Sequence, residues 1–386
     1  MNSIYLDHNA TTPPRPEVIE AVARCCRDGY ANPASQHQMG QQARRVLEEA
    51  REKVAAILGA EAAGSKPDRV IFTSGGTESN NLALFGIALA RDSVPAHLVV
   101  SSIEHASVLG PAEALLERGW RLDTLGATSD GVVRTEDLPG LLTPQTRIVS
   151  VMLGNHETGV LQPVEELARI CQPSGVPLHT DAVQVAGKLP IHFRSLGVAA
   201  LSVSAHKLQG PLGIGALIVR EGIPLQPIHF GGHQQGTLRP GTEPVALAVG
   251  MATALELWQE DHEAHARRLT ALRERFENGL RAGFPELGVN GAAAPRLPHT
   301  SSLAFPGLDG QMLLLALDQV GVACSVGSAC SSGSSELSPT LRAMGLPKTI
   351  VASSLRFSLG ATTSEADVDE AVRRILQVVN GLCGLR

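Results

Sequence analysis

From about residue 40 to residue 250, two patterns of hydrophobic and polar positions follow one another along the chain, one typical of strands and one typical of helices. Short runs rich in β-branched residues and bounded by Gly, Pro or Asp are typical of strands. In chain order these runs are RVIFT (69–73), HLVVS (97–101), RLDTL (121–125), RIVSVM (147–152), VPLHT (176–180), ALSVS (200–204) and GALIV (215–219). Segments of helical length separate most of them, as in 43–58, where apolar residues recur with a helical period. This alternation predicts an α/β fold with a mainly parallel sheet sandwiched between helices.

A second region begins within a long helical pattern. Residues 245–280 predict one helix that is apolar first and strongly charged afterwards, so that it leaves the first region near residue 260. Further strand and helix patterns follow, and the last helical one is ADVDEAVRRILQVV (366–379). A chain of 386 residues is also too long for one ordinary core. We therefore expect a large domain of residues 15–260 and a smaller α/β domain made of residues 1–14 and 261–386.

Composition and charge narrow the classes of function. The chain is 43% hydrophobic and 18% charged, which is ordinary for a soluble globular protein. Its net charge of −6, without a basic stripe, argues against nucleic acid as a partner. The opening MNSIYLDHNATTP does not resemble a secretory signal, and no apolar run is long enough to suggest a membrane span. Six cysteines without a CxxC pair indicate free thiols, so we expect a cytoplasmic protein without a metal site.

Residues with useful chemistry follow the predicted strands. Glycines and Thr77 follow 69–73 at the start of a helix, a place suited to a phosphate. The other polar residues that follow strands are His105, Asn155, Asp181, Gln184, His206 and Lys207. Each alone has an ordinary explanation, such as a helix cap, an interior histidine or a solvated lysine. Because ligands bind beyond the carboxyl ends of parallel strands, the set together predicts a pyridoxal phosphate site.

The cofactor needs particular groups. A lysine must form the Schiff base, which Lys207 can do. A carboxylate must face the pyridine nitrogen and keep it protonated, because the ring then withdraws electrons; Asp181 is the candidate. An aromatic or imidazole ring over the face of the cofactor would complete the slot, and His105 is the candidate for that position.

Cys330 lies in SVGSACSSGSSELSP (325–339), a run of Ser and Gly without apolar periodicity. A structural cysteine is usually buried among hydrophobic residues, and this segment offers none. We interpret the segment as a functional loop and Cys330 as a reactive thiol. Cys324, in the apolar run VGVACSV, is expected to be packed and unreactive.

The motifs resemble those of the cysteine desulfurases of the NifS/IscS type, class V pyridoxal-phosphate enzymes, in the group with a long GSACSS-type cysteine loop. The resemblance runs through nearly the whole chain in YLDHNATTP (5–13), TSGGTESNN (73–81), EHASV (104–108), TDAVQVAGKLP (180–190), SAHK (204–207), RPGTE (239–243), GSACSS (327–332) and SSLRFSLGATT (353–363). It implies a fold-type I architecture. One departure is His156, which stands where the family usually has a second Asn.

The resemblance also implies a role for each site residue. For the cofactor, it makes Lys207 the Schiff-base lysine, Asp181 the partner of the pyridinium and His105 the stacking ring, with Asn155 and Gln184 bonding the ring hydroxyl and Gly76, Thr77, Ser204 and His206 around the phosphate. Thr242 would reach the phosphate site of the second subunit of a homodimer. Asn155 would also contact the substrate, Arg356 would bind the substrate carboxylate, and Cys330 would accept the sulfur.

The reaction that the resemblance implies is conversion of L-cysteine to L-alanine, with the sulfur left on Cys330 as a persulfide and then passed to an acceptor protein, such as an iron–sulfur scaffold. A selenocysteine lyase acting on L-selenocysteine and a class V aminotransferase are the alternatives, and a non-catalytic scaffold is a third. Because an ordinary thiol is only slightly ionised at neutral pH, Cys330 needs activation. We expect His105 or another group of the pocket to supply it.

Overall fold

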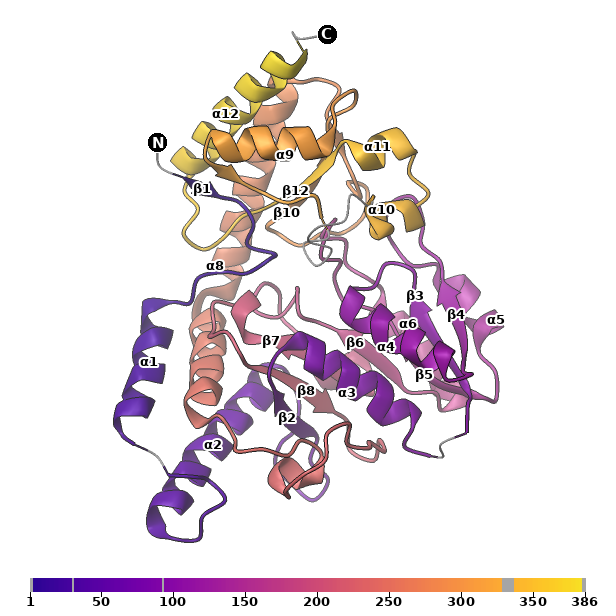
Figure 1. The fold of residues 1–386 in the computed structure, drawn as a ribbon, viewed down its shortest axis with the longest axis vertical. Coiled ribbons are helices and arrows are strands. Elements are labelled where there is room, and N and C mark those ends of the chain that lie inside the picture. The colour runs from indigo at the N-terminus through magenta and orange to yellow at the C-terminus, as the bar shows by residue number, and fades with distance from the viewer. Residues whose placement is uncertain (1–2, 30, 92–93, 328–336, 384–386) are drawn as a thin grey trace.

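The structure, a computed structural model, describes residues 3–29, 31–91, 94–327 and 337–383 (Figure 1). Cys330 lies outside the described residues. The helices are α1 (Pro16–Arg27), α2 (Gln38–Ile57), α3 (Gly76–Ala88), α4 (Ala106–Glu117), α5 (Leu138–Leu141), α6 (Val164–Cys171), α7 (Phe193–Leu196), α8 (Val245–Gly283), α9 (Gly310–Gln319), α10 (Pro339–Ala343), α11 (Lys348–Ala352) and α12 (Glu365–Cys383). The strands are β1 (Ile4–Tyr5), β2 (Arg69–Thr73), β3 (His97–Ser101), β4 (Arg121–Leu125), β5 (Thr146–Ser150), β6 (Leu178–Asp181), β7 (Ala200–Ser204), β8 (Gly215–Val219), β9 (Gly288–Val289), β10 (Thr300–Ala304), β11 (Val322–Ala323) and β12 (Ser354–Ser358).

All seven strands predicted in the first region are present, with small shifts at the ends of β5 and β6. They form one sheet in the order β2-β8-β7-β6-β5-β3-β4. Strand β8 runs antiparallel to both its neighbours, and the other pairs are parallel. The prediction of a mainly parallel sheet is therefore confirmed, and the carboxyl ends of β2, β3, β5, β6 and β7 meet at one edge.

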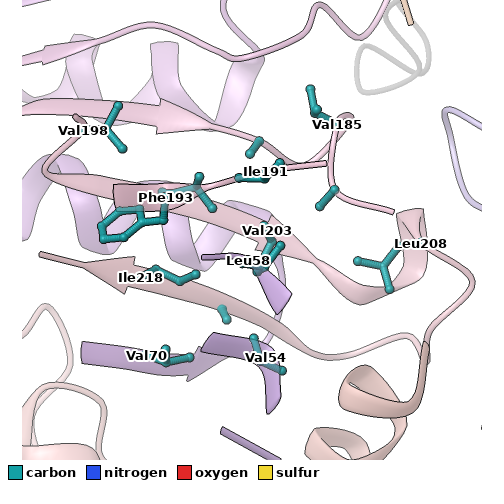
Figure 2. Close-up of a cluster of buried hydrophobic side chains, with 14 of the residues drawn as sticks. Val54, Leu58, Val70, Val185, Ile191, Phe193, Val198, Val203, Leu208 and Ile218 are labelled. Carbon is teal, nitrogen blue, oxygen red and sulfur yellow. The ribbon is translucent and has the colours of Figure 1, made fainter. Parts of the chain in front are cut away.

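Helices cover both faces of this sheet. On β2, Val70 and Phe72 pack into one core with α2, α6 and the first half of α8, whereas Ile71 packs into a second core with α3 and α4. This alternation follows from the two-residue period of a strand, and burial on both faces explains the continuous apolar runs. Figure 2 shows part of the first core, where Val54, Val70 and Phe193 lie among other apolar side chains.

The long helix α8 links two parts of the molecule, as Figure 1 shows. Leu255, in its first half, packs into the sheet core, and Leu272 and Phe276, in its second half, pack into a separate core. That second core also holds Ile4 and Leu6 and the apolar faces of α9 and α12, over the three-stranded sheet β12-β10-β9. We propose that the two cores correspond to the large and small domains expected from the sequence.

No helix within the described ranges is both long and apolar enough to cross a membrane.

Cys324 is partly buried and packs against the second core, where burial raises the pKa of its thiol to about 12. This agrees with the expectation that Cys324 is packed and unreactive.

Candidate active site

A cavity of about 200 Å³ lies at the carboxyl ends of the parallel strands, and we call it the Asp181 cavity. Its lining includes most of the residues predicted for the cofactor: Gly76, Thr77, His105, Asp181, Gln184, Ser204, His206 and Lys207. They come from four different strand ends, those of β2, β3, β6 and β7, because the parallel topology brings those ends to one edge of the sheet. The structure thus brings these predicted residues together around one cavity.

One end of the Asp181 cavity has the properties of a phosphate cradle. No side chain of the N-cap residue, Gly75, caps α3, and Gly76 and Thr77 of its first turn line the cavity. The first backbone N–H groups of the helix and its dipole are therefore available to an anion at this end. A Cβ atom at Gly76 would lie 2.8 Å from Cγ2 of Val183, so a side chain there would fill this space. The Ser204 hydroxyl is buried and has no partner among the described residues. A phosphate would satisfy both the hydroxyl and the helix N-terminus.

The Asp181 carboxylate is held by two hydrogen bonds. Its Oδ1 accepts from the backbone N–H of Val183 at 2.9 Å, and its Oδ2 accepts from Asn80 Nδ2 at 2.7 Å. Asp181 is only 6% exposed. A fixed, buried carboxylate in this cavity suits a cationic ring nitrogen, so the residues present fit pyridoxal phosphate.

Lys207 lies directly after β7 in a short 3₁₀ turn, Ala205–Lys207. Its Nζ donates to the backbone carbonyl oxygens of Ala10, at 2.8 Å, and Asn9. A second lysine, Lys188, donates from its Nζ to the carbonyl oxygen of Lys207. Burial and the charge of Lys207 lower the pKa of Lys188 to about 7. Burial and both lysines lower the pKa of His206 to about 4, so His206 is neutral.

His105 is the N-cap of α4, and its Nδ1 accepts the backbone N–H of Ser107 at 3.1 Å. The ring lies edge-on to His156, with 5.3 Å between centroids and 86° between planes. Burial, followed by the charges of His105, Arg356 and Lys207, holds the pKa of His156 well below its usual range. His156 therefore supplies a neutral imidazole that fixes His105 from one side.

A second cavity of about 250 Å³, the Arg356 cavity, adjoins the first. Both cavities are lined by Ala10, His105, His156, Gln184 and Lys207. Arg356, on β12, is 3% exposed and donates from Nη2 to Asp7 at 2.7 Å. Its Nη1 donates to the carbonyl oxygens of Gly327, at 2.9 Å, and His156, at 3.0 Å. Its Nε is buried without a partner among the described residues. The Nε–H and the second Nη2–H are thus the donors left for an anionic ligand.

Two buried carboxyl groups also line the Arg356 cavity. Burial raises the pKa of Glu104 to about 8, assisted by Asp181, against hydrogen bonds from Ser101 and the Met152 N–H. Burial likewise raises the pKa of Glu157, whose Oε2 accepts from the Ser338 hydroxyl. Glu104 is thus a carboxylic acid at neutral pH.

Two predicted site residues, Asn155 and Thr242, line neither of these cavities, and a third lies outside the described residues. Asn155 is fully buried; its amide donates to the Ile103 carbonyl and accepts from Glu157 and Thr158 backbone N–H groups, and it lines neither cavity. Thr242 lines a separate surface pocket. Cys330 lies outside the described residues. Their predicted roles stay predictions.

Sequence reasoning missed several residues of the site. It gave no role to Asn9, Asn80, Glu104, Ser107 or Lys188. The signal was present, since all five lie within the quoted motifs 5–13, 73–81, 104–108 and 180–190. Polar residues inside a motif that marks a strand end deserved the same weight as the neighbours that were chosen.

The comparisons with known proteins agree with this geometry. The model of the family described as aminotransferase class-V matches residues 4–371. The chain belongs to this family. A cysteine desulfurase IscS of Dictyoglomus turgidum is 40% identical over 97% of this chain and 94% of its own length. An IscS-like cysteine desulfurase of Mycobacterium tuberculosis is 42% identical over 95% of this chain and 94% of its own length.

A solved structure titled NifS-like protein is similar in fold, with a TM-score of 0.90 and 33% identity over 98% of this chain and all of that chain. The family, its fold and its cofactor are those expected from the sequence. Class V enzymes of the desulfurase group use pyridoxal phosphate, and the donors of the Asp181 cavity fit that group.

Proposed function

We propose that this chain is a cysteine desulfurase that converts L-cysteine to L-alanine and transfers the sulfur to Cys330 as a persulfide. The main support is the position of Lys207, which lines both cavities. The Asp181 cavity has the donors for a phosphate and a pyridinium, and the Arg356 cavity has a buried guanidinium for a carboxylate. An amino acid bound in the second cavity would therefore meet Lys207 beside the cofactor.

The residues of the site divide between binding the substrate and binding the cofactor. We propose that Arg356 binds the substrate carboxylate through its remaining donors, on Nε and Nη2. Gln184, which lines both cavities, is proposed to bond the ring hydroxyl. Thr77, Ser204 and His206 are proposed to surround the phosphate, with His105 stacked on the ring.

Proton and sulfur transfer follow from these positions. Bound pyridoxal phosphate supplies an electron sink next to the substrate Cα. The Lys207 amine takes the proton from Cα. The thiolate of Cys330 then attacks the substrate sulfur: an S–S bond forms and the Cβ–S bond breaks, with its electron pair staying on the carbon fragment. Protonation of that fragment gives L-alanine, so one thiol and one L-cysteine yield one persulfide and one L-alanine without an external oxidant.

The persulfide would pass to an acceptor protein. We propose an iron–sulfur scaffold as that acceptor, a cytoplasmic location, and a homodimer in which Thr242 of each subunit serves the phosphate site of the other. Thr242 supports the last point because it is exposed and lies in a pocket separate from its own chain's Asp181 cavity.

Steady-state assays with L-cysteine test the function. Wild type should form alanine, and Cys330→Ser should lose desulfurase activity while retaining the bound cofactor. The matched control is Cys324→Ser, which should keep wild-type activity because Cys324 packs against the second core.

Two results would point to the alternatives. Full alanine formation by Cys330→Ser would indicate an enzyme that does not use this thiol, as in a class V aminotransferase. A kcat/KM for L-selenocysteine far above that for L-cysteine would indicate a selenocysteine lyase.

A further inference from the structure

A chain of hydrogen bonds joins Asp181 to His105 through two residues that the proposed reaction does not use. Asn80, on α3, donates from Nδ2 to Asp181 Oδ2 at 2.7 Å and to the Ser107 hydroxyl at 2.8 Å. The Ser107 hydroxyl lies 2.7 Å from His105 Nδ1. Asn80 is 1% exposed and Ser107 is 8% exposed, so both side chains are largely shielded from bulk solvent.

The direction of each bond is fixed by chemistry. A carboxylate only accepts, so the amide nitrogen of Asn80, and not its oxygen, must face Asp181. The second hydrogen of that nitrogen goes to the Ser107 oxygen. The hydroxyl therefore has its own hydrogen left to donate to His105 Nδ1.

The same ring nitrogen also accepts the backbone N–H of Ser107, which can only donate. Nδ1 of His105 thus accepts two hydrogen bonds and carries no proton. The proton of the neutral ring lies on Nε2. The edge-on contact with His156 holds the ring plane in this orientation.

We propose that Asn80 and Ser107 are positioning residues that hold His105 as the Nε2–H tautomer and tie its ring to the Asp181 carboxylate. The inference rests on the proposed function. His105 then offers a hydrogen-bond donor, and not a lone pair, toward the reacting sulfur. It activates a thiolate by donating a hydrogen bond to the sulfur anion, and it does not remove the thiol proton. Protonation at Nδ1 would break both bonds that hold the ring.

The tautomer can be measured directly. Holoenzyme labelled with ¹⁵N at histidine gives two-bond ¹H–¹⁵N correlations that separate Nε2–H from Nδ1–H rings, and the signals missing in His105→Gln identify His105. Wild type should show the Nε2–H pattern for His105. Ser107→Ala should add an Nδ1–H population and lower kcat about tenfold, with KM nearly unchanged.

A matched pair separates the hydroxyl from the shape of the side chain. Ser107→Thr keeps the hydroxyl and should keep the wild-type tautomer, with kcat within about twofold of wild type. Ser107→Val has the shape of threonine without the hydroxyl and should behave like Ser107→Ala. Asn80→Ala should shift the tautomer in the same direction.

Two outcomes would overturn the proposal: an unchanged His105 tautomer in both Ser107→Ala and Ser107→Val, whatever their activity, or equal losses of kcat in Ser107→Thr and Ser107→Val. If either Ser107→Ala or Ser107→Val does not fold, the tautomer of the other decides. Failure of the proposed function gives a different result: wild type would form no alanine from L-cysteine, yet Ser107→Ala would still shift the tautomer.

Discussion

The two cavities that meet at Lys207 are built in different ways. The Asp181 cavity is lined mainly by residues at the strand ends of one sheet, and its carboxylate is held by two hydrogen bonds. The Arg356 cavity is assembled from segments as distant as Asn9, Glu157 and Arg356, and it holds carboxyl groups whose pKa values burial raises. The Asp181 cavity suits a cofactor that stays bound, because its carboxylate keeps a fixed position. The Arg356 cavity suits a substrate that enters and leaves, because burial raises the pKa of both of its carboxyl groups.

Replacing the residue shared by both cavities should have the largest effect. Lys207→Ala removes the amine that lines both, so alanine formation from L-cysteine should fall at least about 10³-fold. The control is Lys348→Ala, at an exposed position on α11, which should stay within about twofold of wild type. Activity of Lys207→Ala near the wild-type level would mean that the reaction does not depend on the amine that lines both cavities.

The neutral acid of the Arg356 cavity should affect stability through pH. The pKa of Glu104 is raised from 4.5 to about 8 in the folded state, so between these values the folded state binds a proton that the unfolded state has lost. This contribution to the free energy of unfolding is full below about pH 4.5 and is lost as the pH rises toward 8. The loss should be on the order of 5 kcal/mol, and Glu104→Gln should remove it.

Urea unfolding of wild type and Glu104→Gln between pH 5 and pH 8 checks this. The difference in free energy between the two proteins should change with pH, whereas the exposed control Glu165→Gln should run parallel to wild type. Parallel curves for Glu104→Gln would mean that Glu104 is ionised in the folded state, and the contrast between the cavities would weaken.

Arg356→Lys should separate substrate binding from cofactor binding. Lysine keeps a positive charge for Asp7 but loses the planar set of donors, including the buried Nε. The KM for L-cysteine should rise about 10- to 100-fold, while cofactor content and visible absorbance stay as in wild type. Asp181→Asn should change the visible absorbance and leave the KM for L-cysteine nearly unchanged. If both variants alter the absorbance alike, cofactor binding and substrate binding are not separated between the two cavities.

The smallest effect is expected at Cys324, which packs against the second core. Cys324→Ala should leave kcat within about twofold of wild type and lower the urea midpoint slightly, because a partly buried sulfur is removed. A loss of activity in this variant without a loss of stability would place a second functional thiol beside the Arg356 cavity.

The contrast between the cavities also explains how far the sequence could be read. The residues of the Asp181 cavity follow short apolar runs, and the rule that parallel strands end at one edge brings Asp181 and Lys207 together without further information. The ends of β2, β3, β4, β7 and β8 were predicted to the residue from short strand-like runs in the sequence.

The Arg356 cavity was harder to predict, because its contacts join positions far apart in sequence. The pairing of Arg356 with Asp7 spans almost the whole chain, and no local pattern indicates it. The neutral state of Glu104 follows from complete burial, which only the fold determines. Asn155 shows the same limit: its strand-end position suggested a ligand-binding amide, and the folded turn engages that amide internally.

A single-turnover experiment tests the desulfurase proposal most directly. Holoenzyme is mixed anaerobically with one equivalent of L-cysteine, and alanine is quantified while mass spectrometry maps the persulfide on each cysteine-containing peptide. We predict one persulfide on Cys330 for each alanine formed, and none on Cys324. Alanine formed at the full rate without a persulfide on Cys330 would contradict the account.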